Sequence, residues 1–325
     1  MATVSRVLAN RSGFHPETRA RVLAAADALG YDRSWTRRGR TSPAVTTVDI
    51  VLGEVSHWWS DRVVRGAWHA ADRMGFDLTL TTEHDEDEGN DWTSRILRRG
   101  TGGVVLGLTD LSLSQLATLR AAKVPVVLLD PMTSSVEGVE SVGTTDREGG
   151  EAAGAHLVEI GVRDFVLVQA RPAYRFGTAR EAGFRQAIER LGSEARLRTA
   201  QTRWDQGAAI PELAGLMADR VGVLGIFATN DAIALRCYES AAEAGLRVGA
   251  DVLIVGFDDE ARAARAEPPL TTIRQPIEQM AAKAVEIVCA SSAEELLLSP
   301  ARHEIPAHLI VRESTFGSET HGVDV

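Results

Sequence analysis

Short apolar runs of strand length alternate with amphipathic runs of helix length along most of the chain, beginning at Val48. The first apolar run covers 48–55, and in the helix expected over 61–75 the apolar residues recur with a period of 3.6. The apolar runs are nearly continuous Val, Ile and Leu, as in parallel strands that helices cover on both faces. Repeated strand–helix–strand units produce open parallel sheets with right-handed crossovers. The sequence therefore predicts an α/β fold.

The expected elements form two successive groups. The first group has strands at 48–55, 76–82, 103–108 and 125–130, with helices at 61–75, 92–99 and 112–122. The second group has strands at 165–170, 196–200, 222–229 and 252–257, with helices at 146–161, 178–191, 207–220 and 232–244. An apolar stripe from Ile277 to Val288 marks a closing helix. We therefore predict two doubly wound parallel-sheet lobes, with a boundary near 131–141 and a crossover near 258–276.

Two such lobes suggest where a ligand binds. Open α/β sheets bind ligands beyond the carboxyl ends of their strands, and two facing lobes form a cleft that can close on a small molecule. This architecture fits a binding protein at least as well as an enzyme.

Motifs of common enzymes and metal sites are missing from the sequence. Lys123 and Lys283 both follow alanine, so there is no Walker loop, and neither G-x-G-x-x-G after a strand nor G-x-S-x-G occurs. The two cysteines, Cys237 and Cys289, make neither a disulfide framework nor a metal cluster, and the histidines lack ligand spacing. We expect no catalytic residue, cofactor or metal, although an enzyme with an unfamiliar site stays open.

Membrane and export signals are also missing from the sequence. No apolar run approaches the ~18–20 residues that cross a bilayer, and the first residues contain no apolar signal-peptide core. We therefore expect a cytoplasmic protein with no membrane partner.

The amino-terminal arm is basic, although the chain as a whole is acidic. Residues 1–40 contain eight Arg and three acidic residues, a net charge of +5, whereas the whole chain carries −10. Residues 41–325 therefore carry −15. This asymmetry indicates that the arm alone meets a polyanion, or that it is a basic tail without function.

Local signals divide the arm into helices and a linker. Pro16 suits the first turn of a helix, and Gly30 suits its left-handed end. A further short helix fits residues 2–8, and residues 34–43 are polar, basic and rich in helix breakers, which is typical of a linker.

A set of short motifs is spread in order over essentially the whole chain. They are Ala2-Thr3-Val4-Ser5-Arg6-Val7-Leu8, Pro16-Glu17-Thr18-Arg19 with Leu29-Gly30-Tyr31, Ala228-Thr229-Asn230-Asp231, Val255-Gly256-Phe257-Asp258-Asp259, Pro269-Leu270-Thr271-Thr272-Ile273-Arg274-Gln275-Pro276 and Leu309-Ile310-Val311-Arg312-Glu313-Ser314-Thr315. Each motif is weak alone, but the ordered set is specific, and it closely resembles that of the LacI family of transcriptional repressors. The resemblance implies a homodimeric repressor with a partial helix-turn-helix head at 1–33, a hinge at 34–47 and a two-lobed effector and dimerisation core at 48–325.

The resemblance also implies which residues meet operator DNA. Thr3, Ser5 and Arg6 would point into the major groove from the recognition helix. Asn10, Thr18 and Arg21 would contact phosphates, although a solvated helix face is equally open for Arg21. The chain begins inside the recognition helix, so we expect either a longer product from an upstream start or weak DNA binding. The hinge lacks the family's minor-groove leucine; Trp35 could replace it as a wedge or could pack on the core.

The effector residues that the resemblance implies fall at strand ends. In the first lobe they are His57, Trp58, Trp59 and Asp130, and in the second they are Arg180, Trp204, Asn230, Asp258 and Gln275. The planar guanidinium of Arg180 suits two neighbouring hydroxyls, and an indole suits the C–H face of a pyranose. We therefore expect a carbohydrate effector. Alternatives stay open: Trp59 as core between the lobes, Trp204 as a surface cap and Asp258 as a turn cap.

Three functions remain at this point. The leading hypothesis is a transcriptional regulator, acting as a repressor, whose operator affinity is controlled by a small sugar. The second is a cytoplasmic sugar-binding or sensing protein whose DNA-binding head is vestigial. The third is an enzyme acting in the cleft between the lobes.

Overall fold

The computed structural model describes residues 18, 22, 47–53, 55, 57–83, 91–133, 138–191, 194–204, 210–298 and 300–316. The chain divides into two compact units, Met1–Thr46 and Thr47–Val325. The described residues of the first unit are Thr18, which is exposed, and Val22, which is half-buried; both are in helical conformation. The other sequence predictions for the head and the hinge lie outside the described residues: they concern Thr3, Ser5, Arg6, Asn10, Arg21 and Trp35.

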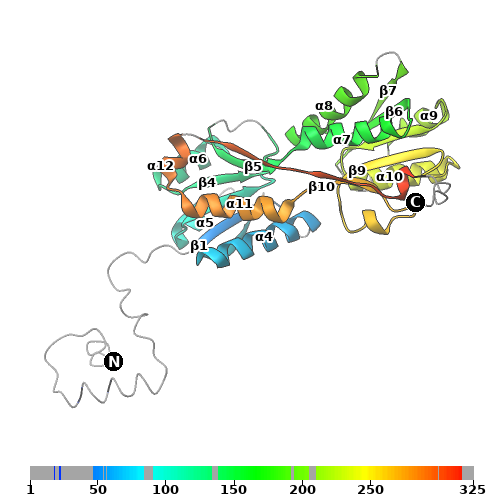
Figure 1. The fold of residues 1–325 in the computed structure, drawn as a ribbon. Coiled ribbons are helices and arrows are strands. Elements are labelled where there is room, and N and C mark those ends of the chain that lie inside the picture. Colours follow the sequence, from blue (N-terminus) through cyan, green and yellow to red (C-terminus); the bar gives the residue numbers. More distant parts are fainter. Residues whose placement is uncertain are drawn as a thin grey trace. The chain divides into compact units, whose positions relative to one another are not determined.

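Two six-stranded sheets form the framework of the second unit as far as it is described (Figure 1). The first sheet has the order β11-β5-β4-β3-β1-β2 and the second has the order β12-β10-β9-β8-β6-β7. The first consists of β1 (Thr47–Leu52), β2 (Asp77–Thr82), β3 (Gly103–Gly107), β4 (Val126–Leu129), β5 (Glu140–Thr144) and β11 (Arg302–Ile305). The second consists of β6 (Asp164–Arg171), β7 (Arg196–Arg203), β8 (Leu224–Ala228), β9 (Val252–Asp258), β10 (Thr271–Arg274) and β12 (His308–Ile310). All pairings are parallel except that of β10 with β12.

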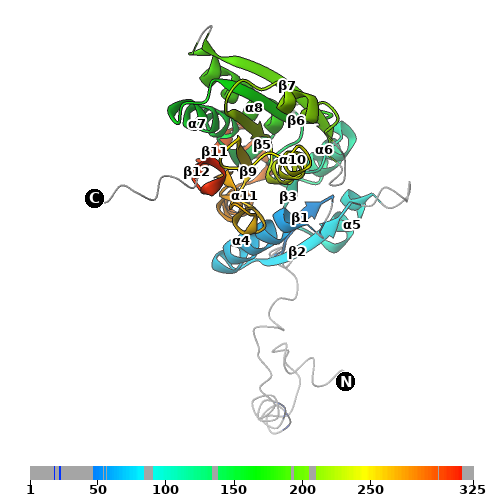
Figure 2. The ribbon, with the colours of Figure 1, turned by 90° about the vertical axis from the view of Figure 1, so that its right-hand side faces the viewer.

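Helices cover both faces of each sheet, as Figure 2 also shows. The first sheet packs against α4 (Trp58–Met74) and α11 (Ile277–Ala290) on one face, and against α5 (Trp92–Arg99) and α6 (Leu113–Ala121) on the other. The second sheet packs against α7 (Asp146–Glu159) and α8 (Arg175–Glu189) on one face, and against α9 (Leu213–Ala218) and α10 (Asp231–Glu243) on the other. A short helix, α12 (Ala293–Leu298), follows α11. Burial of both sheet faces explains the nearly continuous apolar strands and confirms the predicted fold class.

Local sequence signals set the ends of the helices. The His57 side chain accepts a hydrogen bond from the Trp59 amide at the start of α4, and Gly75 ends that helix with a left-handed φ of 74°. Ser112 and Gln115 form a capping box at the start of α6. These caps satisfy amides that would otherwise lack partners at the helix ends.

The lobe boundary differs from the predicted one. Strand β5 pairs with β4 in the first sheet, so the chain leaves the first lobe after Thr144 rather than near 131–141. It returns between β10 and α11, at the end of the predicted crossover 258–276, and crosses a third time between β11 and β12. The sequence analysis missed β5, β10, β11 and β12 because they are short and, except for β12, mostly polar, and only pairing with neighbouring strands makes them strands.

In the part of the chain that is described, no helix has both the length and the apolar character needed to cross a membrane. That part also contains no group of three or more His, Cys, Asp or Glu side chains placed to hold a metal ion.

Candidate functional site

A cavity of about 770 Å³, open to solvent, lies where the carboxyl ends of strands from both lobes meet. The side chains that line it come from both sheets and the helices next to them: His57, Trp58, Trp59, Leu108, Asp130, Met132, Tyr174, Phe176, Arg180, Trp204, Asn230, Ala232, Asp258, Glu260 and Gln275. The structure thus brings all nine effector residues suggested by the sequence to one cavity. That they bind an effector stays a prediction.

Strand ends at the cavity adopt an unusual backbone conformation. Leu108, Asp130 and Asp258 have φ values of 46°, 51° and 124°, in the region that side-chain-bearing residues rarely adopt. They stand at the ends of β3, β4 and β9. Such strain persists only where the surrounding structure holds it, and it is concentrated at functional sites.

Arg180 is the centre of the polar part of the cavity, and it is only 2% exposed. Its Nε donates to Asp146 Oδ1 at 2.9 Å, and its Nη1 donates to the Thr229 carbonyl at 2.9 Å and to Asp258 Oδ1 at 3.5 Å. The guanidinium lies 3.7 Å from the centre of the Phe257 ring, so this buried cation also has an aromatic partner. No described residue accepts a hydrogen bond from Nη2, which leaves that nitrogen for a ligand.

Carboxylic acids surround this arginine. Burial raises the pKa of Asp130 to about 7; the nearby Asp146 carboxylate adds to the rise, and Arg180 opposes it. Burial likewise raises the pKa of Asp258 to about 7, against the lowering effect of Arg180 and of a 2.5 Å hydrogen bond from Gln275 Nε2. Since Asp258 contacts both Arg180 and Gln275, it is more than a turn cap.

An Asp130→Asn variant should reveal the raised pKa of Asp130. A carboxyl group whose pKa rises on folding stabilises the fold while it is protonated, and this contribution disappears as the pH rises through the folded-state pKa. The variant, neutral at every pH, should therefore gain stability relative to the parent between about pH 4 and about pH 7, and the gain should then level off. Urea unfolding of both proteins across this range measures the difference. A difference that does not change with pH would contradict the raised pKa.

Aromatic side chains form two walls of the cavity. On the first lobe, Trp58 lies 5.5 Å from the His57 ring. On the second lobe, Tyr174 lies 5.1 Å from Trp204 and 5.6 Å from Phe176, ring centre to ring centre. The Trp204 indole also donates to the Pro172 carbonyl at 2.6 Å, so it belongs to an aromatic cluster rather than forming an isolated surface cap.

Trp59 has a different place from the other two tryptophans. It is 4% exposed and packs within the core of the first lobe, while one edge lines the cavity. Trp59 is therefore mainly a core residue, as the alternative expected, but it belongs to the core of the first lobe and not to a core between the lobes. We treat it as a wall of the cavity.

Several buried polar atoms of the lining have no hydrogen-bond partner among the described residues. They are Trp58 Nε1, Trp59 Nε1, Asp130 Oδ1 and Gln275 Oε1. An unsatisfied buried polar group costs about 1–3 kcal/mol. Two donors and two acceptors thus belong to residues of a single lining but are themselves buried, so a ligand's hydroxyl groups could pair with them only after the side chains shift to expose them.

Contacts of α8 and α4 tie the two lobes together beside the cavity. The Arg175 amide donates to the Met132 carbonyl at 2.8 Å, and its Nε donates to the Pro131 carbonyl at 3.3 Å. On the other side, Arg62 Nη2 donates to the Asp259 carbonyl at 3.4 Å. A change in the relative orientation of the lobes would have to break these hydrogen bonds.

The sequence analysis missed some lining residues. Tyr174 and Phe176 follow β6, so the strand-end rule could have found them. Met132 and Glu260 follow β4 and β9 in the same way. Asp146 begins α7, and only the packing of α7 against α8 brings it to Arg180.

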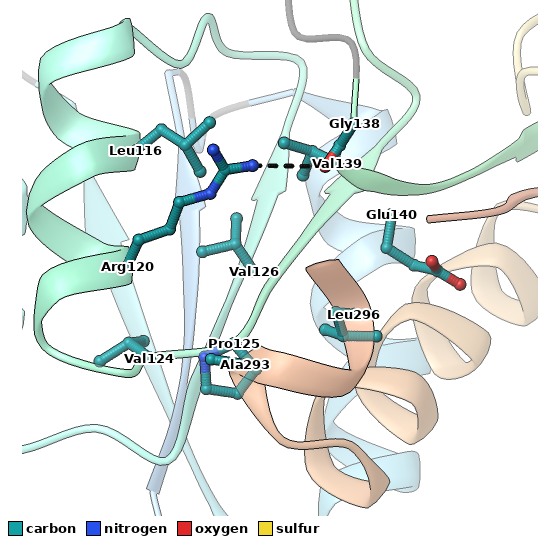
Figure 3. A pocket seen from close by; sticks show the side chains of 10 residues that line it. All are labelled: Leu116, Arg120, Val124, Pro125, Val126, Gly138, Val139, Glu140, Ala293 and Leu296. Carbon is teal, nitrogen blue, oxygen red and sulfur yellow. Dashed lines mark hydrogen bonds between the residues drawn. The ribbon is translucent and has the colours of Figure 1, made fainter. Parts of the chain in front are cut away.

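A smaller pocket lies in the first lobe between α6 and α12, with an open space of about 280 Å³ (Figure 3). Its lining is mainly apolar. Arg120 Nη2 donates to the Gly138 carbonyl at 3.4 Å, and Glu140 turns its carboxylate away from the other lining side chains. That carboxylate accepts from the Ala301 amide at 2.7 Å and lies 2.6 Å from His303 Nε2. Both charged side chains of this pocket therefore already have hydrogen-bond partners.

Comparison with known proteins gives matches over nearly the whole chain. Residues 1–34 match the model described as bacterial regulatory proteins, lacI family, and residues 155–315 match that of a periplasmic binding protein-like domain. The HTH-type transcriptional regulator MalR of Streptomyces coelicolor is 30% identical over 97% of this chain and 92% of its own length.

Solved structures match as well. A CelR–cellobiose complex, described as a transcriptional regulator, is 25% identical with a TM-score of 0.70, over 95% of this chain and 94% of that one. A lac repressor dimer bound to operator and the anti-inducer ONPF is 21% identical with a TM-score of 0.75, over 97% and 95% of the two chains. At this identity, the similarity to the lac repressor shows a shared fold.

Proposed function

Since the chain belongs to the LacI family of bacterial transcriptional regulators, we propose that it is a homodimeric repressor whose operator affinity is controlled by an uncharged sugar in the cavity between the lobes. The convergence on one cavity of nine residues from both lobes, several of them at strand ends, is the main support for the effector part of the proposal. The relatives are regulators by name, which supports binding of the sugar without chemical transformation.

The charges of the cavity favour an uncharged sugar. Asp130, Asp258 and Glu260 line the cavity, whereas the one arginine of the lining is already engaged by two carboxylates. A phosphate group would meet more acidic than basic groups there. Neutral hydroxyl groups, in contrast, could accept from Arg180 Nη2 and donate to the carboxyl groups without any charge repulsion.

The sugar would act on the orientation of the lobes. A ligand held by residues of both lobes favours the orientation in which both sets of contacts form. If operator DNA also favours one orientation, the two ligands are coupled, and each changes the affinity of the other by the same factor.

The head would read the DNA. We propose that residues 1–33 form the head and 34–47 the hinge, ahead of the core at 48–325. Thr3, Ser5 and Arg6 would contact base edges, and Asn10, Thr18 and Arg21 would contact phosphates. Thr18 is exposed, as a contact with phosphate requires.

Matched sugars test the effector part of the proposal. Calorimetry on the full chain should detect binding of at least one neutral sugar from a panel of mono- and disaccharides. At about pH 8, above the pKa of about 7 of Asp130 and of Asp258, the phosphate ester of that sugar should bind at least about tenfold more weakly, because ionised Asp130, Asp258 and Glu260 repel it. Tighter binding of the ester would overturn the assignment to uncharged sugars.

The same sugar tests the regulatory part. DNA selected from a randomised duplex library by the full chain is labelled, and its affinity is measured by fluorescence anisotropy with and without the sugar. The affinity should change when the sugar is added, and it should fall steeply as salt concentration rises. Unchanged DNA affinity with bound sugar would refute the regulatory proposal.

A further inference from the structure

The cavity between the lobes continues into a second compartment inside the first lobe. This first-lobe compartment, about 570 Å³ and open to solvent, is lined by Gly53, His57, Trp59, Ser60, Gly107, Leu108 and Met132. Four of these residues, His57, Trp59, Leu108 and Met132, also line the cavity between the lobes. The two spaces therefore adjoin at these four shared side chains.

Small residues create the compartment. Gly53 follows β1, Gly107 ends β3, and Ser60 lies in the first turn of α4. A Cβ atom at Gly107 would lie 2.8 Å from Leu52 Cδ2 and 3.0 Å from Trp59, so that glycine lets Trp59 lie against the strand. The hollow thus lies beyond the carboxyl ends of two parallel strands, where α/β sheets bind ligands.

The two spaces differ in chemistry. The cavity between the lobes contains the charged and amide groups, namely Asp130, Arg180, Asn230, Asp258, Glu260 and Gln275. The first-lobe compartment has none of these groups: its larger side chains are Trp59, Leu108 and Met132, which it shares with the cavity, and its polar side chains are His57 and Ser60. The cavity between the lobes suits a sugar ring whose hydroxyl groups each form hydrogen bonds, and the first-lobe compartment suits the apolar C–H face of a ring.

We propose that the effector is a disaccharide, with one ring between the lobes and the second ring in the first-lobe compartment. The inference rests on the proposed sugar-binding function and names the size of its ligand. The ring between the lobes is selected strictly, because polar groups of both lobes read its hydroxyl groups. The second ring is selected loosely, because it packs mainly on apolar side chains.

Calorimetry on the full chain tests the proposal by comparing disaccharides with their constituent monosaccharides, for example cellobiose, maltose and trehalose with glucose, and lactose with galactose. The best disaccharide should bind at least about tenfold more tightly than either of its monosaccharides, because it contacts both spaces. Equal or tighter binding of a monosaccharide would overturn the proposal and leave the sugar-binding function intact. If no sugar of either size binds, the proposed function itself fails.

Substitution of Gly53 tests the place of the second ring. A Cβ atom there would lie 3.8 Å from the Leu108 carbonyl oxygen and 3.8 Å from Thr109 Oγ1, with no closer neighbour among the described residues, so a side chain can start from this lining position without a close contact at its Cβ. Gly53→Leu should weaken disaccharide binding at least about tenfold and leave monosaccharide binding within about twofold, and Gly53→Ala should have a smaller effect in the same direction. Gly215→Leu, on exposed α9 surface with no neighbour near its Cβ position, is the control. Equal weakening of both sugar sizes, or none, would refute the placement.

Discussion

Replacing Arg180 with alanine is expected to remove measurable sugar binding and to lower the free energy of unfolding by about 3–5 kcal/mol. The substitution removes the cation that lies among Asp130, Asp146 and Asp258, all of them buried. Without it, these carboxyl groups lose their main source of positive charge and two hydrogen-bond donors. The sugar in turn loses the free Nη2 donor at the centre of the cavity.

Two measurements separate these effects. Urea unfolding gives the change in stability, and calorimetry at a temperature where the variant is folded gives the change in affinity. Arg185→Ala is the matched control, because Arg185 lies on the same helix and bonds Glu181 and Thr199 at 2.8 Å, away from the cavity lining. Arg180→Lys keeps the charge but not the planar fork, and should also bind sugar poorly. Undiminished sugar affinity in folded Arg180→Ala would remove this residue from the binding site.

Gly183→Ala is the second substitution with a large expected effect, and it acts through the contact between α7 and α8. A Cβ atom at Gly183 would lie 1.8 Å from the Arg147 carbonyl oxygen, and one at Gly150 would lie 2.0 Å from the Arg180 carbonyl oxygen. The two helices therefore touch backbone to backbone through this pair of glycines. A methyl group at Gly183 must push them apart, which should destabilise the fold by about 3 kcal/mol or more.

The same substitution should also weaken sugar binding, because α7 carries Asp146 and α8 carries Arg180. Separating the helices lengthens the hydrogen bond that holds the guanidinium in place. Gly177→Ala is the control on the same helix: nothing lies within 4 Å of its Cβ position, so it should be neutral or stabilise by about 0.5–1 kcal/mol. Urea unfolding and calorimetry on both variants measure the contrast. Equal stability of the two variants would show that the helices have room to separate.

The effector residues that the family resemblance implies lie together in one cavity, and their binding of an effector stays a prediction. His57, Asp130, Asn230 and Asp258 also follow or end apolar runs, and parallel strands bring such ends to one edge of a sheet. The positions of helices were predicted for the same kind of reason, since a 3.6-residue apolar period can be read locally. Boundaries shifted by a few residues, as between the expected helix at 61–75 and the observed α4.

Other features could not be read from the chain alone. Strands β5 and β11 are short and polar, and each becomes a strand through a partner distant in sequence, as in the pairing of Arg302 with Ser141. The position of Asp146 beside Arg180 depends on two glycines that let α7 and α8 touch. The first-lobe compartment likewise arises from small side chains contributed by three separate segments.

The sequence by itself determined the alternation of strands and helices, the α/β class and the family, because each of these follows from local periodicity or from the order of short motifs. Only the tertiary structure decided which strands share a sheet, which acids surround Arg180, and how far the cavity extends. These depend on contacts between segments far apart in the chain, such as Asp146 with Arg180 and Arg180 with Asp258, and on space left by glycines. Local sequence preferences do not encode such contacts, because each contact stabilises the fold only after both partners have come together.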